Sequence, residues 1–238
     1  GTEDKGRPAQ MPERKDTEPG YKALGLPIGG EGKWFEFIPD FDTEQQSRKR
    51  KPNNKDGANP SAELLKEKAK KLLDSDVAWL DSKGDKIKSS TNNSDFLRKM
   101  ISSGTLADKM ASMMLMIQEA PMHRLHVLDN LLKMAAKKGK REHGMALDTL
   151  KDLFVADLLP DRKLCFFHEQ PLHLYDKIEA RVFVFWYFED SIKRRFAEFV
   201  QHLEGATHDT LTHVRSKTCR IAFDLLKDKA EQEAATLF

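Results

Sequence analysis

The chain has 238 residues, which is enough for one large domain or two smaller ones. Charged residues make up 33% of it, hydrophobic residues make up 39%, and the formal net charge is only +2. This balance excludes a uniformly basic chain, so any contact with nucleic acid has to come from local clusters.

Residues 1–59 show no hydrophobic period and are rich in proline and glycine, which predicts a largely irregular arm that is extended or disordered. Within this arm, Lys33–Phe41 gathers five large apolar side chains. They are Trp34, Phe35, Phe37, Ile38 and Phe41. Such a cluster in a polar arm predicts docking, either on the chain's own domain or on a partner protein. The chain begins at Gly1 without an initiator methionine, so we expect it to be part of a longer protein.

The arm also carries a short basic run with no acidic residue inside it. Its members are Arg48, Lys49, Arg50 and Lys51. The run is typical of a nuclear import signal or of an arm that binds nucleic acid. It is equally typical of a solvated linker, and the sequence alone leaves both interpretations open.

Residues 60–93 are predicted to form a leading helix and a linker. Pro60 suits the first turn of a helix, Asn59 is available as its N-cap, and apolar residues recur from Leu64 to Leu80. The polar stretch Gly84–Asn93 then links this helix to the next.

A series of amphipathic helices is predicted from Ser94 onward, beginning with a short helix that Ser94 caps. Thr105 and Asp108 form a capping-box pattern that starts the next helix, and Pro121 ends it. Two further stripes of apolar residues follow, before Gly139 and before Pro160 respectively. Their members are Leu125, Leu128, Leu132 and Ala135, and then Leu147, Leu150, Phe154 and Leu158.

In the second half of the chain, the sequence predicts one long helix followed by two shorter helices. Arg181–Leu203 is apolar nearly all round in its first half, which predicts burial on several sides. We expect Gly205 to end this helix, Thr207 to cap another, and Glu231–Phe238 to form a short tail helix. Since short turns make neighbouring helices fold back on one another, the fold class is all-α and residues 94–238 are predicted to begin a helical-repeat domain.

No catalytic or metal-binding constellation is recognisable in the sequence. His123 and His126 lie three residues apart without a third ligand at metal spacing, and Cys165 near His168 is weak support for a nucleophile pair. The two cysteines are too few for a disulfide framework and indicate a reducing compartment. No apolar run is long enough to span a membrane. We therefore expect a non-enzymatic protein without metal, cofactor or membrane partner.

One basic run exceeds what the predicted helices need. Its members are Lys137, Lys138, Lys140 and Arg141, and no acidic residue lies between Asp129 and Glu142. Asp129 has the spacing to pair with Lys133. One or two cations would suffice to complement a helix C-terminus, so four predict an external anion such as RNA phosphate. Arg162 and Lys163 are candidates for the same edge or for another.

Several segments resemble the nucleolar complex protein 1 family. They are Ser102–Met110, Met145–Leu164, Trp186–Asp190 and Thr207–Lys217. The resemblance covers roughly residues 94–238. It implies a HEAT/armadillo-like α-solenoid that acts as a nucleolar scaffold in early assembly of the large ribosomal subunit and in pre-rRNA processing. It also implies contact with pre-ribosomal RNA, nucleolar complex protein 2, other large-subunit assembly factors and ribosomal proteins.

Two other functions are compatible with the sequence. One is a DNA-binding transcription regulator of CCAAT boxes, as a name within the family suggests, although no zinc finger, basic zipper or recognition helix is recognisable. The other is a repeat scaffold that binds only proteins and whose charged residues are solvated.

Overall fold

The computed structural model describes residues 24–29, 32–38, 61–83, 91–137, 141–175 and 178–229. Over these residues the chain forms seven α-helices and no strand, which confirms the all-α class. The helices are α2 (Ala62–Lys83), α3 (Thr91–Ser103), α4 (Leu106–Glu119), α5 (Leu125–Ala135), α6 (Arg141–Leu153), α7 (Ala180–Thr207) and α8 (Thr212–Asp228). The predicted tail helix at Glu231–Phe238 lies outside the described residues.

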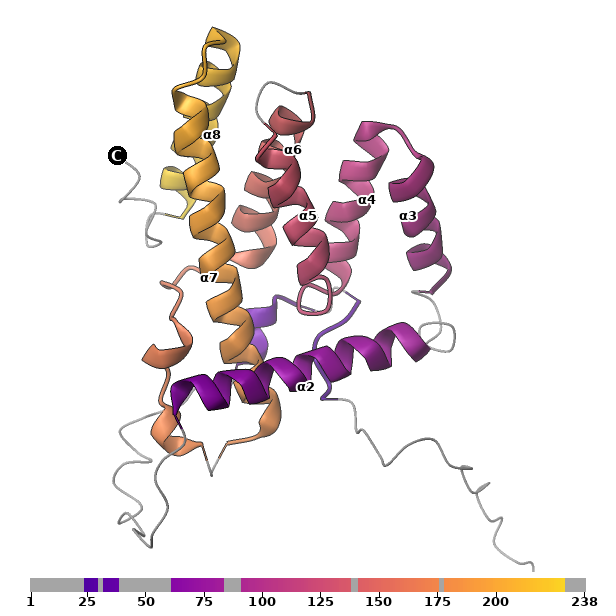
Figure 1. The fold of residues 1–238 in the computed structure, drawn as a ribbon, viewed down its shortest axis with the longest axis vertical. Helices are drawn as coiled ribbons and strands as arrows, with labels where there is room; N and C mark the ends of the chain where they lie inside the picture. The colour runs from indigo at the N-terminus through magenta and orange to yellow at the C-terminus, as the bar shows by residue number, and fades with distance from the viewer. Residues whose placement is uncertain are drawn as a thin grey trace, which may run out of the picture.

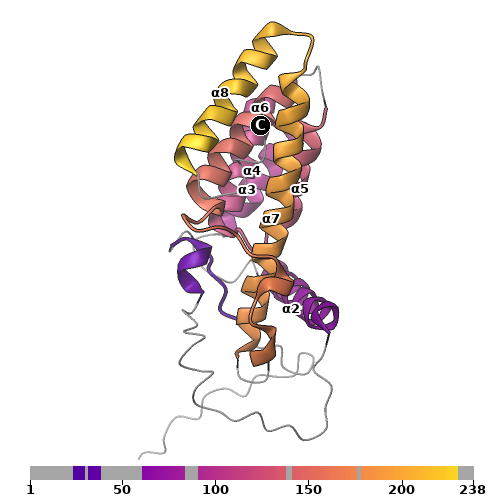
Figure 2. The same cartoon turned by 90° about the vertical axis from the view of Figure 1, so that its left-hand side faces the viewer.

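Helices α3 to α8 stand side by side, and α2 crosses beneath them (Figure 1). Each helix from α3 onward packs on the next one in the chain. The contact between α6 and α7 is the smallest of these. Contacts also join α4 to α6, α5 to α7, and α6 to α8. Seen from the side, α8 lies next to α6 while the long helix α7 lies next to α5 (Figure 2). The bundle is therefore built from two rows of helices.

The α3–α4 corner follows its predicted chemistry. Thr105 is the N-cap of α4: its side chain accepts a hydrogen bond from the Asp108 amide, and the Asp108 carboxylate accepts one from the Thr105 amide. This reciprocal capping box satisfies amides that a helix start leaves free. The preceding helix α3 begins at Thr91, three residues before the predicted cap Ser94.

Helix α6 continues directly into a π-helix, η2 (Phe154–Leu158). Phe154 and Leu158 are fully buried in this turn, and the chain leaves it at Leu159 just before Pro160. The apolar stripe of α6 and its end at Pro160 were predictable, whereas the wider π-turn was not. Two short 3-10 turns follow, η3 (Phe167–Glu169) and η4 (Leu172–Leu174), before α7 begins.

Helix α7 is the central element of the core. Val184, Phe185 and Phe188 in its first half are completely buried, as predicted, and so are Ile192 and Phe199 farther along. The prediction that Gly205 ends α7 is wrong, because the helix runs on to Thr207 and Ala206, directly after the glycine, is fully buried. The helix that Thr207 was expected to cap instead begins at Thr212.

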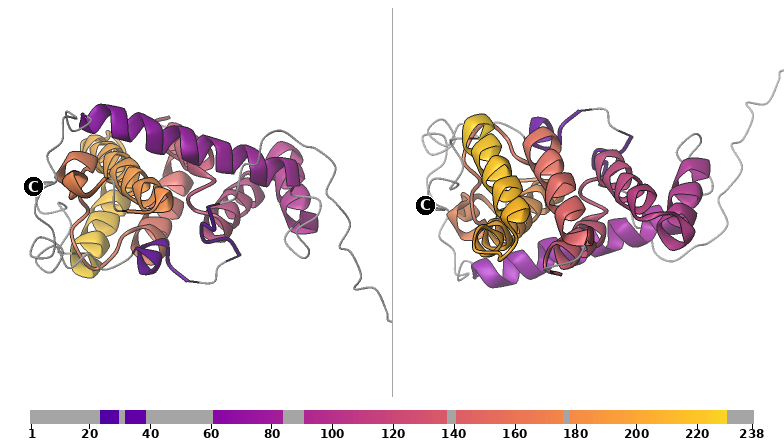
Figure 3. Two further views of the ribbon diagram at one scale, coloured as in Figure 1. Left: turned by 90° about the horizontal axis from the view of Figure 1, so that it is seen from below. Right: turned by 90° about the horizontal axis from the view of Figure 1, so that it is seen from above.

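Helix α2 closes the lower end of the bundle. It runs along one side of the row from α7 toward α3, as the views from below and above show (Figure 3). The N-terminal part of α2 packs on α7 through Leu65 and Ala69, which lie in a small cluster with Phe183 and Trp186. Among the helices that the structure describes, none combines the length and apolarity needed to cross a bilayer.

Candidate nucleic-acid interface

The predicted basic run lies at the turn between α5 and α6. Lys137 follows the last residues of α5, Arg141 is the first residue of α6, and both are exposed. Lys138 and Lys140 lie outside the described residues. No described residue forms a hydrogen bond or an ion pair with the Arg141 side chain. The turn therefore presents at least one exposed guanidinium beyond the end of the bundle.

The charge pairing around this turn differs from the prediction in two ways. The carboxylate of Asp129 accepts two hydrogen bonds from Arg195 of α7, at 2.7 and 3.1 Å, so the predicted pair with Lys133 is wrong. Lys133 is exposed and has no ion-pair partner among the described residues. Lys137, in contrast, pairs with Glu142 at 3.0 Å. A bidentate guanidinium pair across two helices outcompetes a single intrahelical ammonium contact.

Arg162 and Lys163 lie at the other end of α6, separated from Arg141 by the whole helix and η2. An α-helix rises about 1.5 Å per residue, which places the two ends roughly 25 Å apart. Arg162 forms a two-pronged ion pair with Glu189 of α7, whose side chain is only 1% exposed, and it also donates to the Lys163 carbonyl. Arg162 therefore neutralises a buried carboxylate and does not extend the basic turn.

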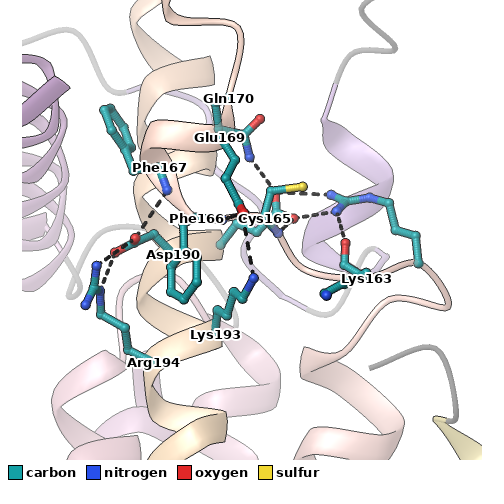
Figure 4. A network of polar contacts seen from close by, with 11 residues as sticks. Lys163, Cys165, Phe166, Phe167, Glu169, Gln170, Asp190, Lys193 and Arg194 are labelled. Atoms are coloured by element: carbon teal, nitrogen blue, oxygen red, sulfur yellow. Dashed lines mark hydrogen bonds and ion pairs between the residues drawn. The ribbon is translucent and has the colours of Figure 1, made fainter. Parts of the chain in front are cut away.

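Two buried carboxylates of α7, Glu189 and Asp190, tie the segment after η2 to this helix, and Figure 4 shows Asp190 with its partners Phe167 and Arg194. Glu189 accepts hydrogen bonds from the Cys165 amide at 2.9 Å and from the Gln170 side chain at 3.3 Å. Its neighbour Asp190 accepts from the Phe167 amide, from Arg194 and, at 2.6 Å, from Lys66 of α2. These hydrogen bonds and ion pairs join α2, α7 and the segment between η2 and α7.

The same network explains the ionisation of its members. Burial alone would raise the pKa of Asp190, but hydrogen bonds from Arg194, Lys66 and the Phe167 amide outweigh it and hold the pKa below its usual range. Burial, aided by the charge of Glu189, raises the pKa of the Cys165 thiol. A raised pKa disfavours the thiolate, so this cysteine is a poor nucleophile.

No group of three or more histidine, cysteine, aspartate or glutamate side chains suits a metal ion within the described part of the chain. His123 instead contacts the buried Asp76 carboxylate at 2.9 Å. The charged groups in the interior thus join elements of the fold.

The aromatic segment of the arm docks on the chain's own helices. Trp34 is completely buried, packs edge to face on Phe188 with 5.0 Å between ring centroids, and donates its indole N–H to the Leu158 carbonyl at 3.0 Å. Phe35, Phe37 and Ile38 are partly buried against the same core. The fifth member, Phe41, and the basic run Arg48, Lys49, Arg50 and Lys51 lie outside the described residues.

A pocket of about 280 Å³ lies beside the basic turn, between the first turns of α6 and α8. Lys217 of α8 reaches over Gly144 of α6 and pairs with Asp148 at 2.5 Å. Residue spacing in the sequence does not connect Lys217 with α6.

No family model matches the chain. CCAAT/enhancer-binding protein zeta of Mus musculus is 36% identical over 219 residues, which cover 87% of this chain and 19% of that protein. The human protein of the same name gives 36% over 218 residues. The ribosome biogenesis protein NOC1 of Chaetomium thermophilum is 31% identical over 242 residues, covering 94% of this chain and 22% of that protein.

The chain thus spans about a fifth of the length of these curated relatives. The matches cover more of the chain than the segments that first suggested the likeness. Over most of its length, the chain is homologous to the protein family that includes CCAAT/enhancer-binding protein zeta and the ribosome biogenesis protein NOC1.

Proposed function

We propose that the chain is part of a non-enzymatic ribosome assembly factor that binds pre-ribosomal RNA and partner proteins in the nucleolus. Homology to a protein named for ribosome biogenesis supports the general role. The resemblance to the nucleolar complex protein 1 family extends it to early large-subunit assembly and pre-rRNA processing. The expected protein partners are nucleolar complex protein 2, other large-subunit assembly factors and ribosomal proteins.

The proposed architecture is a HEAT/armadillo-like α-solenoid. In such a fold each helix packs on its sequence neighbour and on the equivalent helix of the adjoining repeat. The contacts of α4 with α6, α5 with α7, and α6 with α8 support this arrangement. A solenoid of this kind offers a row of helix ends and interhelical turns as a binding edge. The α5–α6 turn is one such edge.

The observation that carries the RNA role is the charge at this turn. Lys133 and Arg141 are exposed without an ion-pair partner among the described residues, and Lys138 and Lys140 are their neighbours in sequence. Lys137 adds a cation that is paired with Glu142, both side chains being partly exposed. Exposed pairs of this type contribute little to stability, so the lysine can exchange its carboxylate for a phosphate at small cost. Among the described residues, the fold therefore does not depend on the charges of Lys133 and Arg141.

Charge reversal tests this role. We expect a variant with Lys137, Lys138, Lys140 and Arg141 changed to glutamate to bind pre-rRNA fragments more weakly. The salt dependence should also fall, by roughly 0.7 in log–log slope for each phosphate of single-stranded RNA that the variant no longer neutralises. A matched control reverses four exposed lysines elsewhere, Lys68, Lys70, Lys71 and Lys99, which gives the same change in net charge. Equal loss in both variants, or none in either, would refute a specific role for the turn.

A second function is suggested by the name of the mammalian relatives, which designates a CCAAT-binding protein. A competition assay between duplex DNA carrying a CCAAT box and structured rRNA distinguishes the DNA-binding function from the RNA-binding one. A clear preference for the duplex would favour a DNA-binding regulator. Binding of neither nucleic acid, with retained binding of assembly factors, would favour a scaffold that binds only proteins.

A further inference from the structure

The pocket between α6 and α8 has the chemistry of an anion site with an apolar wall. On one side it is lined by Arg141, His143 and Gly144 from the first turn of α6, and on the other by His213 and Lys217 of α8. Met145, Leu147, Leu211, Val214 and Thr218 complete the lining. No acidic side chain is among these residues. The pocket therefore combines cations with a surface suited to a planar or aliphatic group.

Two helix N-termini meet at this pocket. Helices α6 and α8 both begin at the upper end of the bundle and pack against each other (Figure 1). A helix N-terminus carries a partial positive charge and free backbone amides, both of which attract anions. Leu211 is the N-cap residue of α8 and supplies no side-chain hydrogen bond to the first-turn amides. Two dipoles and the Arg141 guanidinium thus act on the same space.

Three acidic groups lie near the pocket outside its lining, and one of them, Asp209, accepts a hydrogen bond from the Leu211 amide at the start of α8. Glu142 pairs with Lys137 and does not line the pocket. Asp148 pairs with Lys217, whose ammonium nitrogen would lie 3.4 Å from a Cβ atom at position 144. The carboxylate of Asp148 therefore holds the lysine against the wall of the pocket.

His143 provides an independent observation that points to a ligand. Its side chain lines the pocket, the residue is only 3% exposed, and its Nδ1 is bonded to the Ala135 carbonyl. Since a carbonyl oxygen only accepts, Nδ1 carries the proton and the second nitrogen, Nε2, is an acceptor in the neutral ring. Nε2 is buried and has no hydrogen-bond partner among the described residues. Buried polar atoms normally have a hydrogen-bond partner, so Nε2 is free to accept a bond from a ligand.

We propose that this pocket holds one unpaired nucleotide of RNA, with its phosphate at the helix N-termini and Arg141 and its base or ribose against the apolar wall. This inference rests on the proposed RNA-binding role of the adjoining turn and locates the contact within it. A nucleotide offers an anion for the cations and a hydroxyl donor for His143, and the volume of about 280 Å³ limits the occupant to a small group. Unpaired nucleotides are the parts of an RNA that can be splayed into such a pocket.

Filling the pocket without changing any charge gives the sharpest test. A leucine at position 144 has room for its Cβ atom, whose nearest neighbour would be the end of the flexible Lys217 side chain. The rest of the leucine side chain would occupy the pocket. The matched control is Ala111→Leu, which adds a leucine to an exposed position on α4. Both variants of the whole chain are titrated with a short, unstructured single-stranded RNA and with an RNA duplex, using fluorescence anisotropy.

We expect Gly144→Leu to bind the single-stranded RNA about tenfold more weakly, the scale of losing the contacts of one nucleotide, and Ala111→Leu to bind it normally. The duplex should be bound equally by both variants. Gly144→Leu could bind single-stranded RNA normally while the charge-reversed variant binds it weakly. That result would refute the nucleotide site and leave the proposed function intact. Absence of RNA binding by the unmodified chain would overturn both.

A second measurement does not depend on how the variant folds. The unmodified chain is crosslinked to single-stranded RNA that contains 4-thiouridine, and the crosslinked peptides are identified by mass spectrometry. We expect adducts on the first turns of α6 and α8, near Met145 and Leu211, and their loss when excess unlabelled RNA competes. Adducts confined to other helices, or competition by a phosphorylated acidic peptide but not by RNA, would contradict the assignment.

Discussion

The indole nitrogen of Trp34 donates a hydrogen bond to the carbonyl oxygen of Leu158 at 3.0 Å, across 124 positions of sequence. This contact joins the aromatic segment of the arm to the π-helix that ends α6. Beside it, the ammonium of Lys33 pairs with Asp157 at 2.5 Å, and Asp157 also accepts from the Gln118 side chain of α4. Trp34 thus packs between η2 and α7, and the described segment around it is part of the core.

Replacing Trp34 by alanine should therefore act as a core mutation. The indole is fully buried, so we expect a loss of about 3–5 kcal/mol in the free energy of unfolding, measured by urea denaturation. Phe223→Ala is the control, because Phe223 is 65% exposed and should lose less than about 0.5 kcal/mol. Similar stability of Trp34→Ala and the unmodified chain would mean that the segment does not contribute to the core.

The pair formed by Arg162 and Glu189 makes a second prediction. Arg162→Met removes the guanidinium and leaves the buried Glu189 carboxylate without its counter-charge, which should cost about 2–3 kcal/mol. Adding Glu189→Met should restore part of that loss, because the second change removes the buried charge. The coupling is read from a double-mutant cycle in urea. Strictly additive losses would show that the two groups do not interact.

Two glycines should respond in opposite ways to alanine. At Gly144 the added Cβ would meet only Lys217 Nζ at an ordinary 3.4 Å, so Gly144→Ala should stabilise the chain by about 0.5–1 kcal/mol through helix propensity. At Gly104 the Cβ would lie 2.5 Å from the Met100 carbonyl oxygen, so Gly104→Ala should destabilise by more than that amount. Thermal unfolding measures both effects. A change of melting temperature with the same sign in both variants would contradict this prediction.

The pH dependence of stability should report Asp190. Its pKa is lower in the folded chain than the value of about 3.9 in unfolded chains, so the ionised form stabilises the fold. That contribution is complete above about pH 4 and is lost as the pH falls through the folded pKa. Asp190→Asn should therefore lower stability by about 1–3 kcal/mol at pH 7 and by less in strong acid. A stability difference that stays constant from pH 7 to pH 2 would contradict this assignment.

Local sequence rules predicted the elements that depend on local chemistry. The capping box of Thr105 and Asp108 starts α4, and the apolar run of α7 is buried, because neighbouring residues suffice to determine both. The end predicted at Gly205 failed because burial of Ala206 in the core outweighs the low helix propensity of one glycine. Tertiary packing determined that boundary.

Charge partners were the least predictable feature of the candidate site. Asp129 has a lysine at helical spacing on its own helix, yet it binds Arg195 of α7, 66 positions away. Sequence spacing leaves Arg162 as a spare cation because its partner Glu189 lies 27 positions along the chain. The pocket beside Gly144 depends on α6 and α8 being neighbours, which no local pattern encodes. Residue spacing tests only contacts within one helix.

The central claim is that the upper end of α5, α6 and α8 binds ribosomal RNA. Crosslinking of the full-length protein to RNA in cells, followed by identification of the crosslinked peptides, tests it most directly. We expect adducts concentrated between Lys133 and Met145 and between Leu211 and Lys217, on RNA that maps to pre-rRNA. Adducts that avoid both segments, or a protein recovered without RNA, would contradict the claim.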